Sequence, residues 1–180
     1  MIYCFLAEGF EELEAIAPVD LIKRAGVDVK TVGVGSDTIT GSHGITFKTD
    51  LTDCDILLSE DLSGIILPGG MPGTINLENN ENVQKAIDFC AEKGKLICAI
   101  CAAPSILGHK NLLSGKEAIS YPGFEKDLYG AEISENAVAV SGNIITAKGA
   151  GVAVDFGLEI VAYLKSREAS DKIREQIQCV

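Results

Sequence analysis

The chain has 180 residues, of which 47% are hydrophobic, and a formal net charge of −11. This length predicts a single domain over residues 1–180, with enough chain to bury a full core. The acidic balance, with no lysine or arginine cluster longer than two neighbours, argues against a nucleic-acid partner, whose phosphates need concentrated positive charge.

Neither a membrane span nor a signal peptide is expected. No window approaches 18 unbroken apolar residues, which rules against a membrane partner. The start "MIYCFLAEGFEELEA" turns acidic by residue 8 and lacks both a basic beginning and a small-residue cleavage site. We therefore expect a cytoplasmic protein, in which most of the six cysteines are reduced: Cys4, Cys54, Cys90, Cys98, Cys101 and Cys179.

Apolar runs and helical periodicity alternate along the chain. Strands are predicted at 1–7, 27–34, within 37–48, at 63–70, 95–100 and 117–121, and as a hairpin over 137–149 that turns at Gly142 and Asn143. Helices are predicted at 8–26, 80–94 and 103–115, and one or two at 151–178; in the first, Leu13, Ile16, Leu21 and Ile22 share one side and Pro18 interrupts the pattern. This order predicts an α/β fold with a mostly parallel sheet covered on both faces.

Three predicted strands end in segments suited to a site. They read "LAEGFEE" (6–12), "LPGGMPG" (67–73) and "AICAAPS" (99–105). Since ligands of such sheets bind beyond the carboxyl ends of the strands, we expect the three segments to converge.

Cys101 occupies the junction between a predicted strand and a predicted helix. A tight turn there would present the side chain to the positive end of the helix, a field that favours thiolate and lowers the pKa of a cysteine. Neighbouring backbone N–H groups would receive an oxyanion. The alternative is a buried structural cysteine, the usual fate of an intracellular one.

Cys98 and Cys101 form a C-x-x-C pair, but redox and zinc roles are disfavoured. Cys98 lies inside the apolar strand rather than in the first turn of a helix. Zinc would require a second pair of ligands, and the two histidines, His43 and His109, are isolated in the sequence. We expect no metal and no cofactor.

The other two segments offer backbone donors and carboxylates. "LPGG" at 67–70 either makes a tight turn or exposes the N–H of Gly69 or Gly70 to an anion, and it lacks the lysine of a phosphate loop. The acidic cluster Glu8, Glu11, Glu12 and Glu14 reads as the solvated first turn of a helix. Glu14 is the one expected to face the sheet, where it would share a proton with Cys101.

"EGFEELEAIAPVDLIKRAG", "IILPGGMPG" and "AICAAPSIL" together resemble the ThiJ/PfpI superfamily, in its DJ-one (Parkinson disease protein) branch. "ITAKGAGVAVDFGLEIVAYL" (145–164) is similar to the same branch, so that the resemblance spans nearly the whole chain. It implies a flavodoxin-like three-layer sandwich, a homodimer, and a nucleophile elbow at Cys101. It places the protonated carboxyl group on Glu14 and the oxyanion donors on Gly70 and Ala102.

The resemblance implies activity as a glutathione-independent glyoxalase or a deglycase, or a role in oxidation sensing or as a chaperone. The protease branch carries a histidine directly after the cysteine, where this chain has Ala102, so a PfpI-type peptidase is a weak interpretation. The family often has a histidine before a proline about twenty residues later. Here "ISYPGF" puts Tyr121 before Pro122, and a phenol is a poor base near neutrality.

Two functions are therefore expected. In the first, Cys101 attacks a small dicarbonyl such as methylglyoxal, or a glycated adduct; Gly70 and Ala102 hold the oxyanion, Glu14 moves protons, and Tyr121 orients the substrate. In the second, Cys101 is oxidised as an oxidative-stress sensor or a redox-regulated chaperone, a role that needs no general base. The first is favoured.

Overall fold

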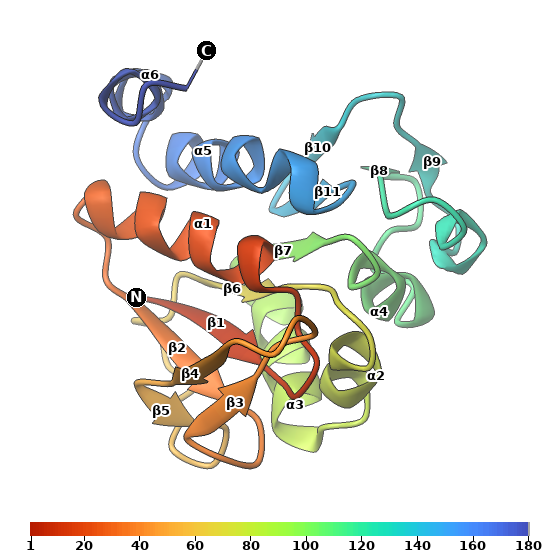
Figure 1. The fold of residues 1–180 in the computed structure, drawn as a ribbon. Helices are drawn as coiled ribbons and strands as arrows, with labels where there is room; N and C mark the ends of the chain where they lie inside the picture. Colours follow the sequence, from red (N-terminus) through yellow and green to blue (C-terminus); the bar gives the residue numbers. More distant parts are fainter. Residues whose placement is uncertain (180) are drawn as a thin grey trace.

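The computed structural model describes residues 1–179, which form a mixed sheet between two layers of helices (Figure 1). The main sheet has seven strands in the order β10-β11-β7-β6-β1-β2-β5, parallel except for β10. Their bounds are Val138–Ser141 (β10), Ile144–Ala147 (β11), Leu96–Ile100 (β7), Gly64–Leu67 (β6), Ile2–Leu6 (β1), Val29–Gly33 (β2) and Leu51–Thr52 (β5). This confirms the predicted α/β fold and its flavodoxin-like arrangement.

Helices cover both faces of the sheet. One layer holds α1 (Glu12–Arg24), α5 (Ala153–Leu164) and α6 (Arg167–Gln176), and the other holds α2 (Gly73–Glu78), α3 (Glu81–Glu92) and α4 (Pro104–His109). A hairpin of β3 (Thr38–Thr40) and β4 (Thr46–Lys48) lies outside the sheet, as do β8 (Glu117–Ala118) and β9 (Glu132–Ile133). Short 3-10 turns lie at Glu125–Asp127 and Ala150–Val152.

The central strands are apolar because both of their faces are buried. Every residue of β1 is buried, with Cys4 and Leu6 packed toward α1 and α5, and Tyr3 and Phe5 packed toward α3. The same holds for β7, in which Cys98 is a fully buried packing residue. All six cysteines are free thiols.

The first helix begins later than predicted and buries a different face. Residues 7–11 form a turn, closed by the Phe10 N–H donating to the Ala7 carbonyl, and the helix starts at Glu12. Leu13 is 61% exposed because it lies about 200° around the helix from the buried Ala15, so its expected place on the inner face is wrong. Pro18 is inside the helix on the buried face, and the helix continues to Arg24.

Two further elements differ from expectation. The predicted helix at 103–115 ends at His109, after which Asn111 takes a left-handed backbone with φ 57°. The predicted strand at 117–121 is reduced to Glu117–Ala118 and pairs with β9 instead of joining the main sheet. Helix α2 was not expected, because "GTINLE" follows a glycine-rich turn and has no helical apolar pattern long enough to read.

Among the helices of residues 1–179, none has both the length and the apolar run that crossing a bilayer requires.

Gly157 lets α5 approach α1 closely, which gives a test of this layer. A Cβ at Gly157 would lie 2.6 Å from Leu21 Cδ1 and 2.9 Å from Pro18 Cα. Gly157→Ala should therefore lower the free energy of unfolding by about 1–3 kcal/mol in urea titrations. Gly151→Ala is the control, because a Cβ there meets no atom within 4 Å. Equal midpoints for the two variants would contradict the packing.

Candidate active site

Cys101 follows β7 directly and has a left-handed backbone, with φ 66°. Such a conformation is uncommon for a residue with a side chain and costs about 1–3 kcal/mol. Two backbone hydrogen bonds fix it: its N–H donates to the Ala147 carbonyl at 2.9 Å, and its carbonyl accepts from the Tyr121 N–H at 2.7 Å. The thiol is thereby presented at the carboxyl end of the sheet, partly exposed, as a nucleophile elbow requires.

The three strand ends converge around this thiol, as predicted. The Glu11 N–H donates to the Gly69 carbonyl at 3.0 Å, which joins the first segment to the second. A Cβ on Gly69 would lie 2.6 Å from the Cys101 Cβ, and Gly70 takes a φ of 88° against Gly9 and Phe10. Glycine is required at 69 and 70 because the segments leave no room for a side chain.

Glu14 reaches the site from the first turn of α1. Its side chain is buried, and its Oε2 accepts from the Gly69 N–H at 2.9 Å. The Ala150 N–H is a second donor, and the Cys101 thiol hydrogen-bonds the same carboxyl group. Glu11, the residue that caps the helix, accepts from the Glu14 N–H at 2.8 Å and so fixes the start of the turn.

Burial raises the pKa of Glu14 to about 7, with the nearby Glu11 charge acting in the same direction and the hydrogen bonds from Cys101, Gly69 and Ala150 opposing. Burial and the Glu14 charge raise the pKa of Cys101 to about 12. The lowered pKa expected from the following helix is therefore wrong while Glu14 is ionised. Helix α4 has only six residues, and the N–H groups of Gly70 and Ala102 do not offset the burial and the carboxylate.

Cys101 and Glu14 together hold one negative charge between about pH 7 and about pH 12. Transfer of the thiol proton to the carboxylate would leave that charge on sulfur without altering the total. The thiolate would then face a neutral carboxyl group and the N–H groups of Gly70 and Ala102, all of which are donors. The arrangement can therefore generate a nucleophile by proton transfer within the pair.

The structure thus brings four of the five candidate residues together: Cys101, Glu14, Gly70 and Ala102. The fifth, Tyr121, lies at the rim. Its side chain is 51% exposed and lines a cavity of about 360 Å³ with Pro122 and residues 148–152. Tyr121 is therefore positioned to touch a substrate rather than the Cys101–Glu14 pair itself.

Two members of the acidic cluster, Glu12 and Glu14, are buried, while Glu8 is exposed and Glu11 is half-buried. Glu12 is buried, not solvated, and fastens the turn after β3 by accepting from the His43 N–H at 2.8 Å and contacting His43 Nδ1 at 2.9 Å. Glu11, Glu12 and His43 have potential metal-ligand atoms within 4.8 Å of one another. Because both Glu12 oxygens already accept hydrogen bonds from the turn, we assign this group a structural role.

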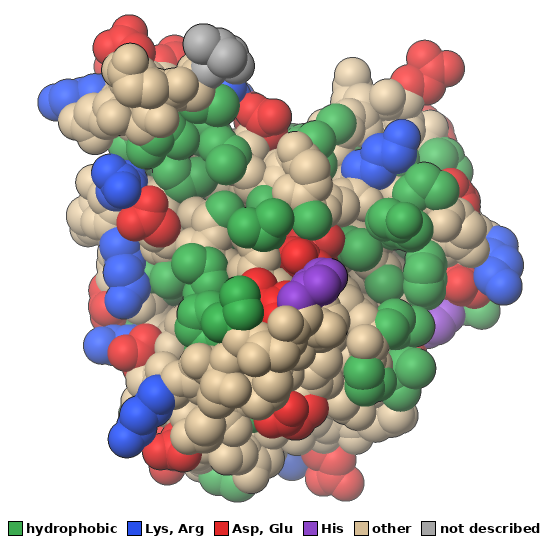
Figure 2. Space-filling model, in the orientation of Figure 1, with side chains coloured by type: hydrophobic (Ala, Val, Ile, Leu, Met, Phe, Trp, Pro, Cys, Tyr) green, Lys and Arg blue, Asp and Glu red, His purple; other side chains and the backbone are tan. Residues whose placement is uncertain are grey.

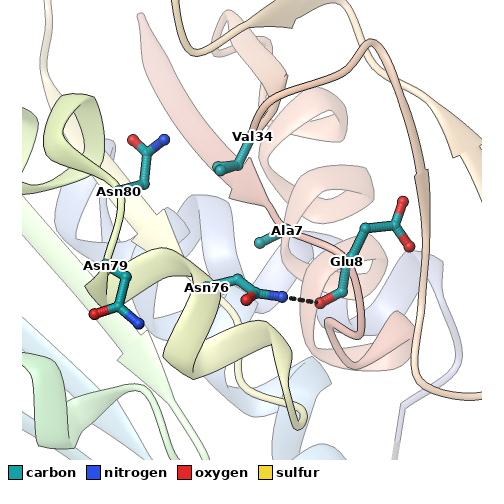
Figure 3. A pocket seen from close by; sticks show the side chains of 6 residues that line it. All are labelled: Ala7, Glu8, Val34, Asn76, Asn79 and Asn80. Atoms are coloured by element: carbon teal, nitrogen blue, oxygen red, sulfur yellow. Dashed lines mark hydrogen bonds between the residues drawn. The ribbon is translucent and has the colours of Figure 1, made fainter.

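A second cavity, of about 300 Å³, lies at the carboxyl ends of β1 and β2 (Figure 3). Ala7 and Val34 line it together with Glu8 and three asparagines, and the Asn76 amide donates to the Glu8 carbonyl at 2.8 Å. No thiol or imidazole of residues 1–179 is among the side chains that line it. The nucleophile belongs to the Cys101 side.

The segment after β11 is a fourth contributor that the sequence reasoning missed. The Ala150 N–H donates to Glu14, and a Cβ on Gly149 would lie 3.9 Å from a Glu14 oxygen. Lys148 lines the cavity beside Tyr121. The sequence holds a signal for this segment, since "KGAG" follows a buried strand that neighbours β7, but the pattern there predicts only the end of a hairpin and the start of a helix.

Comparisons with known proteins identify relatives of the chain and structures with the same fold. The model of the DJ-1/PfpI family matches residues 1–163. The chain is 32% identical over 171 residues to Protein dj-1beta of Drosophila melanogaster, covering 93% of this chain and 91% of that one. It is 34% identical over 145 residues to Deglycase PH1704 of Pyrococcus horikoshii, covering 79% and 86%. The solved structure of oxidized Toxoplasma gondii DJ-1 superposes with a TM-score of 0.93 at 30% identity, covering 98% and 97%.

The raised pKa of Glu14 makes stability depend on pH. Because the folded protein binds this proton more tightly than the unfolded chain, its contribution is full below about pH 4.5 and is lost as pH rises through about 7. Relative to wild type, Glu14→Gln should therefore gain up to about 3 kcal/mol in unfolding free energy between about pH 4 and about pH 8. Urea titrations across that range measure it, with the exposed Glu8→Gln as control. Parallel curves for wild type and Glu14→Gln would show that burial does not hold the proton.

Proposed function

The chain belongs to the DJ-1/PfpI family, and from that premise we propose that it is a cysteine-dependent enzyme that acts on small reactive dicarbonyls or their adducts. The observation that carries the proposal is the hydrogen-bonded pair of Cys101 and Glu14, with two backbone N–H groups directed at the sulfur. The relative from Pyrococcus horikoshii named a deglycase supports an enzyme of this kind. The proposed reaction needs no cofactor and no metal.

The first step is addition of the thiolate to an aldehyde. Glu14 takes the Cys101 proton, and the sulfur attacks the aldehyde carbon of a 2-oxoaldehyde to form a hemithioacetal. The developing oxyanion lies near the N–H groups of Gly70 and Ala102, which already point at the sulfur. Its proton returns from Glu14, so that the charge of the pair is restored.

The second step moves a proton between the two carbons. Glu14, with its pKa of about 7, removes the proton from the former aldehyde carbon and delivers it to the former ketone carbon through an enediol. The product is a thioester of a 2-hydroxy acid. Water then hydrolyses the thioester, which releases the acid and returns the thiol; methylglyoxal plus water gives lactate. An adduct of methylglyoxal with an amine or thiol would follow the same route after the amine or thiol departs.

Tyr121 stands where a histidine is common in the family, and a phenol does not replace its base function near neutrality. In this proposal, Glu14 alone moves protons, and Tyr121 orients the substrate from the rim of the cavity. A PfpI-type peptidase is less favoured, since the residue after the nucleophile is Ala102 and not a histidine.

We also propose that the protein forms a homodimer in the cytoplasm and works without nucleic-acid or membrane partners. Leu13 and Ile45 support a dimer, because they are 61% and 54% exposed and line one hollow with Glu11, Glu12 and His43. Figure 2 shows hydrophobic side chains gathered in the middle of one face, with most lysines and arginines toward its edges. Apolar groups of this kind are typical of protein contacts.

The decisive experiment is lactate formation from methylglyoxal without glutathione. Wild type should turn over, Cys101→Ser should lose activity, and Glu14→Gln should lower kcat by at least about 100-fold, the usual contribution of a general base. Cys54→Ser, at an exposed thiol elsewhere, is the matched control and should keep full activity. Full turnover by Cys101→Ser would refute the mechanism.

An oxidative-stress sensor or redox-regulated chaperone is the second candidate function, favoured by the same donors around the sulfur. Peroxide would oxidise the Cys101 thiolate to a sulfenic acid, with release of hydroxide, and a second equivalent would give the sulfinic acid. The N–H groups of Gly70 and Ala102 would hold its oxygens. The relative from Toxoplasma gondii was solved in an oxidized form.

Mild peroxide tests this second function. Intact-mass spectra should gain about 32 Da, assigned by peptide mapping to Cys101, because Cys4, Cys90 and Cys98 are buried, Cys54 lies on the surface, and Cys179 accepts from the Arg174 guanidinium rather than from main-chain N–H groups. Glu14→Gln should slow the second oxidation, since it lacks the acidic proton that stabilises the product. Oxidation spread evenly over the six cysteines would count against a dedicated sensor.

A further inference from the structure

The cavity beside Tyr121 has one charged side chain in its lining. It measures about 360 Å³ and lies between residues 121–122 and residues 148–152. Most of its wall is apolar: Pro122, Val152, and the backbone and methyl group of the Gly149–Gly151 turn. Lys148 is the one residue of this lining whose side chain carries a charge near neutral pH. Among the lining residues, Lys148 is therefore the one that can attract or repel a ligand by its charge.

The cavity borders the reacting groups. Tyr121 holds the Cys101 carbonyl through its N–H, and Ala147, the neighbour of Lys148, accepts from the Cys101 N–H. At the next residue, a Cβ on Gly149 would lie 3.3 Å from the Tyr121 ring and 3.9 Å from the Glu14 carboxyl group. A substrate whose carbonyl carbon lies at Cys101 would therefore extend its other end past Gly149 toward Lys148.

Lys148 is available to a ligand. Its side chain is exposed, and within residues 1–179 no carboxylate oxygen lies within 4.0 Å of its ammonium group. The chain as a whole carries a net charge of −11, which repels anions at long range. An uncompensated ammonium group at the edge of an apolar cavity reverses that preference locally, and a carboxylate is its complement.

We propose that Lys148 selects 2-oxoaldehydes that carry a carboxylate at the end remote from the reacting aldehyde. This inference rests on the proposed function and names its substrate class. One member of this class is 4,5-dioxopentanoate, which is methylglyoxal extended by a carboxymethyl group. Cys101 adds to its aldehyde carbon, the proton moves from that carbon to the ketone carbon, and hydrolysis of the thioester consumes one water. The product is 2-hydroxyglutarate, and no oxidant or reductant takes part.

Alkylation of Cys101 tests the charge preference without requiring turnover. Iodoacetate and iodoacetamide have nearly the same size and reactivity toward a thiol, but only the first is an anion. Rates at Cys101, followed by peptide mass, give the ratio of the iodoacetate rate to the iodoacetamide rate for each variant. Lys148→Gln should lower this ratio about threefold, and Lys148→Arg should preserve it. The effect should shrink with added salt.

Lys85→Gln is the matched control, because it removes the same charge from α3, outside the cavity lining. It should leave the ratio at its wild-type value. An unchanged ratio in Lys148→Gln, or an equal fall in Lys85→Gln, would overturn the proposal and assign any preference to the net charge of the chain.

Turnover then tests the substrate class. Wild type should have a higher kcat/KM for 4,5-dioxopentanoate than for methylglyoxal, and Lys148→Gln should lower the ratio of the two values at least about threefold, mainly through KM. A wild type with a higher kcat/KM for methylglyoxal would overturn the inference about Lys148 but not the proposed function. Absence of turnover with both compounds would refute the proposed function, and the alkylation ratio would still decide whether Lys148 recognises a carboxylate.

Discussion

The left-handed backbone of Cys101 is the constraint on which the rest of the site depends. A residue with a Cβ adopts φ 66° only where its surroundings enforce it, and here the Ala147 carbonyl and the Tyr121 N–H hold both sides of the peptide. The first bond extends the β7–β11 ladder by one residue, so that strand pairing in the sheet holds the backbone of Cys101 in place. The second ties in the segment that carries the cavity rim. The conformation that exposes the sulfur and the wall that receives a substrate are thus consequences of one set of backbone bonds.

The buried Glu14 controls the protonation of the Cys101 thiol. Burial raises the pKa of both groups, and the Glu14 charge raises the pKa of Cys101 further, while the hydrogen bond from the thiol lowers the pKa of Glu14. The pair therefore behaves as one acid–base unit. An isolated elbow cysteine would rely on a helix dipole, which six residues of α4 supply only weakly. Proton transfer within the pair would remove that need, and would supply the proposed nucleophile in a chain that has Tyr121 where the family often has a histidine.

The sequence predicted the features that have local signatures. Apolar runs marked the buried strands, and the segments ending at Glu12, Gly73 and Ser105 were expected to meet, as they do. The features that the sequence did not predict depend on contacts between residues that are far apart along the chain. Glu12 is buried because the turn after β3, far along the chain, packs on the start of α1, whereas Leu13 is exposed because it lies on the opposite side of the helix from Ala15. The following helix predicts a lowered pKa for Cys101, but burial and the charge on Glu14, which raise it, cannot be judged from the neighbouring sequence. Ala150 and Lys148 are not predicted as site residues, because the pattern shows only that a hairpin strand leads into a helix, and not that this connection meets the start of α1.

Four main-chain N–H groups donate within the site: those of Gly70 and Ala102 to the Cys101 sulfur, and those of Gly69 and Ala150 to the Glu14 carboxyl group. Main-chain geometry survives extensive side-chain replacement so long as the fold is kept, and chains 30% identical to this one superpose with TM-scores of 0.92 and 0.93. Apart from the side chains of Cys101 and Glu14, the proposed reaction centre is therefore made of groups that a side-chain substitution does not remove. Substitutions that change which ligands the cavity accepts are then expected at the rim, where Tyr121 and Lys148 meet the solvent. Such a fold can change its ligand specificity through rim side chains while the Cys101–Glu14 pair and its main-chain donors stay the same.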